Sequence, residues 1–348
     1  MNQKQYLSSK KSNSKLFVVV GIVVIAIFVL SLTLGRYSIP AGEAIRLFIQ
    51  GLFRPGSLDF NDPTVSVFFY IRLPRIVVAL LVGAALAVAG AIFQGMFRNP
   101  LVSPDILGVS SGCSFGAALG ILMPFATIYS ISISSFVFGT LAMGAAYAIS
   151  KASKGEPIIM LILAGMVVSA FFTAALSFLQ YVADPYNELP AIIFWIMGGF
   201  FRITWDIAII LAITIIPCLI IAWLLAWKLD LLSLGDDEAQ SLGLNVKLLR
   251  FVLIIVATFM VAASVSAAGT IAWVGLVIPH IARMLTSSEH TMSVPMSMFV
   301  GGGFVLLMDT VARNLTTAEI PISILTAALG APFFAYLLIS RSHKAWNR

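Results

Sequence analysis

Long runs without a charged residue divide this chain, and their lengths predict membrane-spanning helices. A helix needs about 20 apolar residues to cross a bilayer. Runs near or above that length occur at 16–34, 76–97, 106–150, 157–183, 207–227, 251–282, 291–308 and 320–340. The run 106–150 is long enough for two spans, separated near Pro124. The apolar stretch 189–201 is too short to cross, and we interpret it as an outer surface segment.

Run 251–282 holds either one span or two, and the charges at the chain ends decide between them. Basic residues cluster at both ends, namely Lys4, Lys10, Lys11, Lys15, Arg341, Lys344 and Arg348. Basic flanks favour the cytoplasmic side, so both ends are predicted there and the number of spans must be even. Run 251–282 then supplies two helices, which gives ten spans. Glycine and proline within 267–279 predict short or broken helices near 264–285, tolerated where they pack inside protein or line a cavity.

The lysines agree with this topology, although only those at the termini were used to build it. With ten spans, every lysine falls on the cytoplasmic side: Lys4, Lys10, Lys11, Lys15, Lys151, Lys154, Lys228, Lys247 and Lys344. The predicted organisation is a cytoplasmic tail 1–15, one ten-span domain 16–340 and a cytoplasmic tail 341–348. A signal peptide is the alternative for the first run, but the absence of an Ala-x-Ala-like cleavage site favours a retained span.

Composition supports an all-α polytopic membrane protein and excludes several other classes. The chain is 60% hydrophobic and 10% charged, whereas soluble domains carry about 25% charged residues. Its net charge of +6 fits basic loops beside spans better than nucleic-acid binding. Cys113 and Cys218 lie in apolar runs, and the histidines are scattered, so neither a disulfide framework nor a metal site is predicted. No phosphate-binding glycine motif occurs, so energy must come from an ion gradient or a partner.

One charged segment, 228–250, interrupts the apolar sequence on the predicted cytoplasmic side. It holds seven of the 36 charged residues. Ser233 followed by the acids 236–238 resembles a helix start, because the helix dipole favours acids there, and Gly243 is a plausible stop. Leu242 and Leu244 would be exposed unless a partner covers them. We therefore favour a helix that docks on a soluble partner over a plain connector.

The predicted outer side has arginines but no lysine: Arg36, Arg46, Arg54, Arg72, Arg75, Arg202 and Arg313. Arginine presents a planar fork that suits carboxylates. For Arg36 and Arg202 we favour anchoring of helix ends at lipid headgroups. For Arg72, Arg75 and Arg313 we favour docking of a protein partner, because they flank spans with other functional features. Asp309 is four residues from Arg313 and can pair with it along a helix.

Small residues recur every fourth position in two predicted spans. Gly83, Ala87, Ala91 and Gly95 form a stripe that allows close helix packing. In another span the stripe is Gly165, Ser169, Thr173 and Ser177, which is either a mildly polar wall of a pathway or a packing surface, and we favour packing. Because no lysine or acid lies in mid-span, an ion-coupled secondary transporter or a membrane-embedded enzyme is disfavoured. Residues 38–54 have the spacing of an amphipathic surface helix.

A set of short motifs in fixed order carries a family resemblance. These are Ile71-Arg-Leu-Pro-Arg75, Gly83-Ala-Ala-Leu-Ala87, Gln94-Gly-Met-Phe-Arg-Asn-Pro-Leu101, Pro104-x-Ile-Leu-Gly108, Glu238-Ala-x-x-Leu-Gly243, Gly275-Leu-Val-Ile-Pro-His-Ile-Ala-Arg283, Asp309-x-x-Ala-Arg313 and Gly330-Ala-Pro-Phe-Phe334. Over roughly residues 16–340 the chain resembles the FecCD-type permeases, the transmembrane subunits of ABC importers for iron–siderophore, haem and cobalamin. The resemblance implies ten spans per subunit in the type II importer architecture, and no enzymatic activity or cofactor.

The same resemblance implies partners and sites. It implies a second permease subunit, identical or paralogous, two ATPase subunits and an extracytoplasmic binding protein, in the inner membrane of a prokaryote. Binding-protein docking falls on Arg72, Arg75 and Arg313. ATPase coupling falls on Asp237, Glu238, Ala239, Leu242 and Gly243, and a cytoplasmic gate loop on Lys151, Lys154 and Glu156. An iron(III)–siderophore is the expected cargo, with cobalamin, haem and molybdate as alternatives.

Overall fold

A computed structural model describes residues 3–345 of the chain, in which helices are joined by loops and turns and no strand occurs. The α-helices are α1 (Gln3–Thr33), α2 (Ala41–Phe53), α3 (Pro63–Ser66), α4 (Leu73–Met96), α5 (Val109–Ile121), α6 (Ile128–Ala152), α7 (Pro157–Val182), α8 (Glu188–Met197), α9 (Trp205–Leu234), α10 (Asp236–Ser241), α11 (Val246–Ala268), α12 (Val274–Leu285), α13 (His290–Asn314) and α14 (Ile322–Ala345). A π-helical turn, Val67–Arg72, joins α3 to α4, and 3₁₀ turns occupy Pro55–Ser57 and Pro104–Leu107.

The helices match the predicted spans closely, which confirms the all-α membrane fold. Within the described residues, seven segments are long and apolar enough to cross a membrane, and α5, α8, α12 and α14 are shorter apolar helices. The run 106–150 divides into α5 and α6 on either side of Pro124, as predicted. The predicted terminal tails are mostly helical, because α1 begins at Gln3 and α14 runs to Ala345. Residues 1–2 and 346–348 lie outside the described residues.

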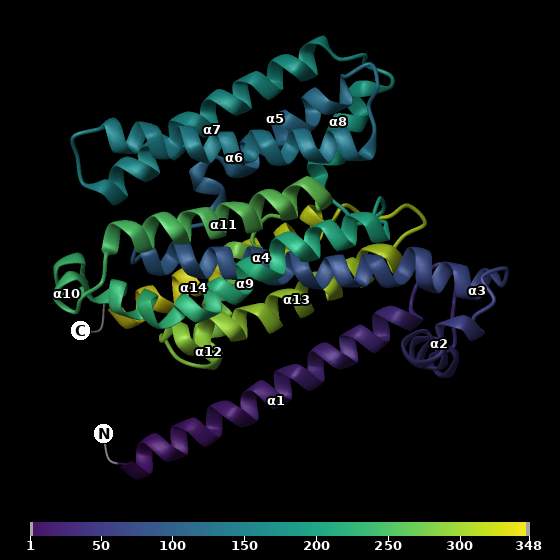
Figure 1. The fold of residues 1–348 in the computed structure, drawn as a ribbon, viewed down its shortest axis with the longest axis horizontal. Coiled ribbons are helices and arrows are strands. Elements are labelled where there is room, and N and C mark those ends of the chain that lie inside the picture. The colour runs from purple at the N-terminus through teal and green to yellow at the C-terminus, as the bar shows by residue number, and fades with distance from the viewer. Residues whose placement is uncertain (1–2, 346–348) are drawn as a thin grey trace.

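Helix α4 forms the centre of the bundle and is buried over most of its length (Figure 1). Its small residues explain how other backbones come so close. A Cβ added at Gly83 would lie 2.2 Å from the carbonyl oxygen of Gly301 on α13, and one at Gly90 would lie 1.8 Å from that of Gly275 on α12. Gly83 belongs to the first small-residue stripe, and a Cβ added at Gly301 would also lie 2.6 Å from Cβ of Ala87 in that stripe. The stripe is therefore a packing surface, as expected for small residues at helix interfaces in lipid.

Helices α5, α6 and α7 lie together on one side of the bundle and share a smaller core of their own (Figure 1). That core contains Ala142, Ala146, Ala164, Val168 and Phe172, with Phe115 and Phe138 packed against it. The rings of Phe115 and Phe138 meet edge to face with centroids 5.0 Å apart. We call the line along which α6 packs on α11 the α6–α11 seam, since it joins this group to the α4-centred body.

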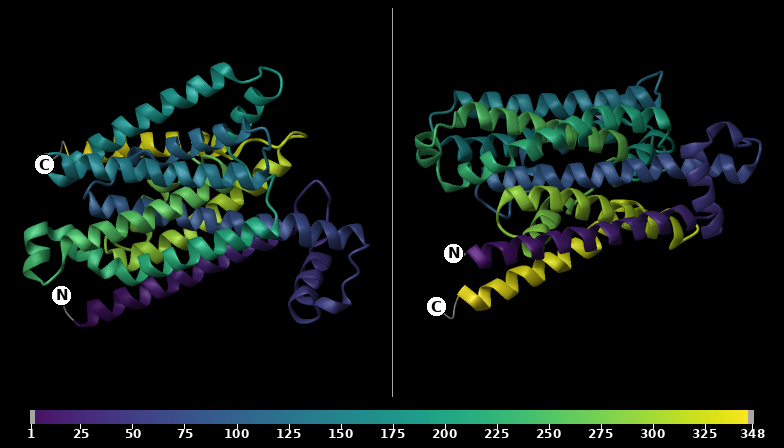
Figure 2. Two further views of the ribbon diagram at one scale, coloured as in Figure 1. Left: turned by 45° about the horizontal axis from the view of Figure 1, so that its top comes forward. Right: turned by 60° about the horizontal axis from the view of Figure 1, so that its bottom comes forward.

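The two ends of the bundle carry different segments. Helix α10 and the terminal ends of α1 and α14 lie at one end, here called the α10 end, and α2 and α3 lie at the other, called the α2 end (Figures 1 and 2). Helix α2 falls within the amphipathic segment predicted at 38–54, and it buries Ala44 and Leu47. Both chain ends therefore share one end of the molecule with the charged segment, as an even number of spans requires.

The run 251–282 is broken into two helices, as its glycine and proline content predicted. Helix α11 ends at Ala268 and α12 begins at Val274. Gly269 has φ +70° and Trp273 has φ +71°, a conformation uncommon for a residue with a side chain. The amide of Gly199 donates to the carbonyl of Ala268 at 2.8 Å, which gives a partner to one of the carbonyls left unpaired at the buried end of α11.

Candidate coupling and docking sites

Helix α10 is a short acidic helix held between two sharp backbone turns. Gly235 precedes it with φ +147°, and Gly243 follows it with φ +84°. The first turn carries Asp236, Asp237 and Glu238, where the partial positive charge of the helix start stabilises them. The amide of Gly243 donates to the carbonyl of Gln240 at 2.9 Å. Left-handed turns of this kind favour glycine, which explains the two glycines that bracket the helix.

Asp236 fixes α10 to the end of the bundle. One oxygen, Oδ1, accepts from Nη2 of Arg98 at 2.7 Å and from Nη2 of Arg250 at 2.7 Å. Arg98 follows α4 and Arg250 belongs to α11, so one carboxylate connects three segments. The side chains of Arg98 and Asp236 are 38% and 33% exposed, so water screens that pair and each contact contributes about 0.2–1 kcal/mol. Sequence reasoning did not find this contact, because Arg98 and Asp236 are far apart along the chain.

The sequence-based description of this segment is right in outline and wrong in two details. A short helix, a turn at Gly243 and an exposed Leu242 (59% exposed) are all present. Ser233, however, belongs to the last turn of α9, and its hydroxyl donates to the carbonyl of Leu229 rather than capping α10. Leu244 is half-buried against the core instead of exposed. The remaining predicted coupling residue, Ala239, is fully buried.

A buried ion-pair network lies at the α2 end. Arg75 donates to Oδ1 of Asp309 from Nη2 at 2.7 Å and from Nε at 3.0 Å. It also donates to Glu319 from Nη1 at 3.1 Å and from Nη2 at 2.9 Å. Arg313 Nε lies 3.2 Å from Oδ2 of Asp309, an ion pair without hydrogen-bond geometry. Arg313 Nη2 donates to the hydroxyl of Ser31 at 2.7 Å.

Arg72 uses its guanidinium to hold the end of α1. Nη1 donates to the carbonyls of Leu32 and Thr33, and Nη2 donates to the carbonyl of Tyr37 at 2.6 Å. The last carbonyls of a helix have no partner within it, and a cation is favourable there. This arginine therefore joins the start of α4 to the end of α1.

All three arginines predicted to dock a partner are buried in this chain. Arg72, Arg75 and Arg313 are 3%, 5% and 7% exposed. Their guanidinium groups already have acceptors inside the chain, so docking on a partner would have to share or exchange those contacts. The docking role stays a prediction. The arginines at this end that are exposed to solvent are Arg36, Arg46 and Arg54.

The second small-residue stripe, on α7, divides between packing and exposure. A Cβ on Gly165 would lie 2.6 Å from the carbonyl of Ile106, and the hydroxyl of Ser169 hydrogen-bonds that of Ser111 at 2.7 Å. Thr173 and Ser177 are exposed on the surface of this chain. The part of the stripe formed by Gly165 and Ser169 is a packing surface. The role of Thr173 and Ser177 stays a prediction.

The predicted gate loop connects α6 to α7 at the α10 end. Lys151, Lys154 and Glu156 are all exposed. The carboxylate of Glu156 accepts the amide of Ile159 at 2.8 Å and so caps the start of α7.

At the α2 end, the loop after α7 is ordered by Asp184. Its carboxylate accepts the amide of Tyr186 at 2.8 Å and the side-chain amide of Asn187 at 3.1 Å, and these donors lower the pKa of Asp184.

Two polar contacts near the α10 end were not found from the sequence. Nη2 of Arg283 donates to Oε1 of Gln94 at 2.6 Å, which joins two of the short motifs across α4 and α12. On α9, Asp230 accepts the amide of His290 at 2.6 Å and lies 2.7 Å from its Nδ1. Asp230 thereby caps the start of α13 from another helix. The sequence shows only that these four residues lie near the ends of predicted spans, and it does not indicate which of them pair.

The comparisons with known proteins agree with this architecture. Residues 22–340 match the model of the FecCD transport family. The chain belongs to the FecCD transport family. Its members are membrane transport subunits of ABC importers rather than enzymes, and ATP hydrolysis takes place in a separate subunit. Members of this kind work with an ATPase and a substrate-binding protein.

Individual relatives of this FecCD family member transport different substrates. The molybdate import system permease of Haemophilus influenzae is 40% identical over 319 residues, which cover 92% of this chain and 94% of that protein. The hemin transport system permease of Yersinia pestis is 37% identical over 286 residues, 80% of this chain and 85% of that protein. A solved structure described as a metal-chelate type ABC transporter in an inward-facing conformation has TM-score 0.83 and 40% identity, covering 94% of this chain and 99% of that one. The fold is that of a type II ABC importer permease.

Proposed function

We propose that this chain pairs with a second permease subunit, identical or paralogous, and that the pair forms the translocation pathway of a binding-protein-dependent importer. Two ATPase subunits bind at the α10 end, which faces the cytoplasm, and a loaded binding protein docks at the α2 end. The observation that carries the proposal is the geometry of α10. Asp236 anchors it to α4 and α11, while Asp237, Glu238 and Leu242 face outward.

This geometry suits the transmission of force from a partner. Asp236 anchors this short helix to Arg98, which follows α4, and to Arg250 of α11. A force applied to α10 is therefore passed on to the end of α4 and to the start of α11. The exposed Leu242 supplies an apolar contact for a groove on the ATPase, and the acids of the first turn supply orientation. Binding and hydrolysis of ATP would thereby re-tilt α4 and α11 and open the pathway to alternate sides.

The experiment uses a Glu238→Lys, Gly243→Pro double variant in the assembled transporter. Proline removes the amide that donates to Gln240 and cannot adopt the φ of +84° found at Gly243. We expect ATP hydrolysis to continue while uptake falls by at least about tenfold, which is about 1.4 kcal/mol of coupling. Glu289→Lys is the control, because it reverses the charge of an exposed acid in the loop between α12 and α13, outside α10. Normal uptake by the double variant would overturn the coupling role of α10.

For the cargo we propose an iron(III)–siderophore or a similar metal chelate. The hemin and other chelate permeases among the relatives, and the metal-chelate transporter with the same fold, support this class. Molybdate is the second candidate, favoured by the 40% identity to a molybdate permease. Uptake of radioactive iron as siderophore complexes and of radioactive molybdate, measured in cells with and without this gene, separates the two. Accumulation of molybdate alone would refute the chelate assignment.

A further inference from the structure

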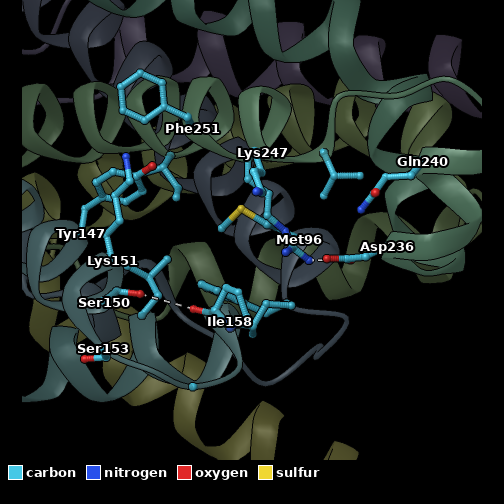
Figure 3. Close-up of a pocket in the computed structure, with 17 residues that line it drawn as sticks. Met96, Tyr147, Ser150, Lys151, Ser153, Ile158, Asp236, Gln240, Lys247 and Phe251 are labelled. Atoms are coloured by element: carbon cyan, nitrogen blue, oxygen red, sulfur yellow. Dashed lines mark hydrogen bonds and ion pairs between the residues drawn. The ribbon is translucent and has the colours of Figure 1, made fainter.

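A cavity of about 420 Å³ opens at the α10 end between the α6–α7 loop, α10 and the start of α11. Figure 3 shows Tyr147, Ser150 and Lys151 on one side of it, Lys247 above, and Asp236 with Gln240 on the opposite side. The cavity lies at the end of the α6–α11 seam. Lys151 belongs to the predicted gate loop, and Asp236 and Arg250 hold α10, but none of these roles places a ligand in the cavity.

The rim of this cavity carries more positive charge than the protein neutralises. Lys151, Lys247 and Arg250 all line it, against the single carboxylate of Asp236. That carboxylate is already shared between Arg250 and Arg98. In the part of the chain that the structure describes, neither lysine lies within ion-pair distance of a carboxylate. The cavity therefore presents three cations and one shared carboxylate to a ligand.

Arg250 brings a third cation to the cavity wall. Its side chain is 14% exposed, and Asp236 holds its guanidinium in place, because Nη2 donates to Oδ1 of Asp236 at 2.7 Å. The positive charge of Arg250 is therefore fixed beside the cavity rather than free to turn into solvent.

The deeper walls of the cavity are apolar and belong to spans. Tyr147 of α6 and Phe251 of α11 face each other with ring centroids 5.5 Å apart. Ile158 and Leu161 of α7 and Ile254 of α11 complete this wall. A free anion needs the charged rim alone, whereas a lipid also needs apolar surface that continues into the membrane. Basic pockets between spans at the cytoplasmic side are known to bind anionic lipid headgroups.

We propose that this cavity binds an anionic phospholipid. The phosphate contacts Lys151, Lys247 and Arg250, and an acyl chain lies along Phe251 and Ile254. The inference does not depend on the transported cargo or on the partners, because it concerns binding by the membrane-embedded chain itself. Bound lipid would tie the α6–α7 loop to α10 across the α6–α11 seam.

The test is binding of phosphatidylglycerol to the purified full-length protein in phosphatidylcholine nanodiscs, measured by native mass spectrometry. A Lys151→Gln, Lys247→Gln variant removes two rim charges. Each lysine near an anionic lipid surface contributes about 1 kcal/mol, so we expect retention to weaken about 30-fold, or about 2 kcal/mol. The matched control is Lys15→Gln, Lys228→Gln, which neutralises two lysines that do not line the cavity and should retain lipid as the native protein does.

Two further arms decide between lipid and other anions. Phosphatidylglycerol with a photoreactive acyl chain should label residues of the apolar wall in the unmodified protein, which keeps the test valid if the lysine variant folds poorly. Inorganic phosphate at millimolar concentration should fail to displace the lipid. Displacement by phosphate, labelling elsewhere, equal retention of phosphatidylcholine, or equal loss in both lysine variants would each overturn the proposal.

Discussion

Removal of the carboxylate of Asp309 should be the most costly single change at the α2 end. Asp309 is fully buried and Arg75 is 5% exposed, and three donor–acceptor contacts of 2.7–3.1 Å join them. Asp309→Leu removes a carboxylate that pairs with both Arg75 and Arg313, and both of these arginines are buried. Removal of one partner of a buried ion pair costs about 3–5 kcal/mol. Since Glu319 still contacts Arg75, and Ser31 still contacts Arg313, we expect the lower value, about 3 kcal/mol.

The assay is equilibrium unfolding of the purified protein in mixed micelles, in which an SDS titration is followed by circular dichroism. A second variant, Arg75→Met with Asp309→Leu, should recover part of the loss, because it replaces the closest buried pair by apolar residues while Arg313 still lacks the carboxylate of Asp309. Glu43→Gln, on exposed α2 at the same end, is the control and should change stability by about 0.5 kcal/mol or less. A loss below about 1 kcal/mol for Asp309→Leu would refute the view that this network stabilises the fold.

Two other predictions follow from packing and topology. Gly83→Leu should destabilise the protein by about 1–3 kcal/mol or more in the same unfolding assay, because even a Cβ there would lie 2.2 Å from the carbonyl of Gly301, whereas Gly21→Ala, where a Cβ would meet nothing within 4 Å, should be neutral. In whole cells, a membrane-impermeant thiol reagent should label Leu315→Cys but not Leu242→Cys. Both native leucines are well exposed, at 62% and 59%, and labelling of the second alone would reverse the proposed topology.

The sequence predicts most of the fold because lipid imposes strong rules on it. Charge-free runs locate the spans, and the break between α11 and α12 falls where glycine and proline allow it. An even number of spans puts the start of α1, the end of α14 and α10 at one end of the bundle, as the structure also has them. Helix α10 is predictable for a similar reason. A cluster of acids followed by glycine favours a short helix and a turn, although the sequence placed the helix start at Ser233 rather than after Gly235.

Local sequence patterns do not specify which side chains contact each other across the bundle. Arg75 and Asp309 are separated by 234 positions, and a pattern of charges at span ends says only that they share a side. The pairing of Asp309 with Arg313 was predictable because the two are four residues apart on one helix. The contacts of Arg72 and Arg75 within the chain were not, and docking of a partner on these arginines stays a prediction. The contacts of Asp236 could not be predicted for the same reason, because its two arginine partners belong to α11 and to the loop after α4.

The division of the core into two groups of helices has a mechanical consequence. Helices α5, α6 and α7 are held to one another by their own aromatic cluster, and the α4-centred helices are held by close backbone contacts at Gly83 and Gly90. Each group therefore resists deformation internally. The two groups are still joined, because Cys113, Met143 and Leu161 belong to the same large core as the α4-centred helices. A motion that slides α6 along α11 keeps more of that buried apolar contact than one that pulls the two groups apart.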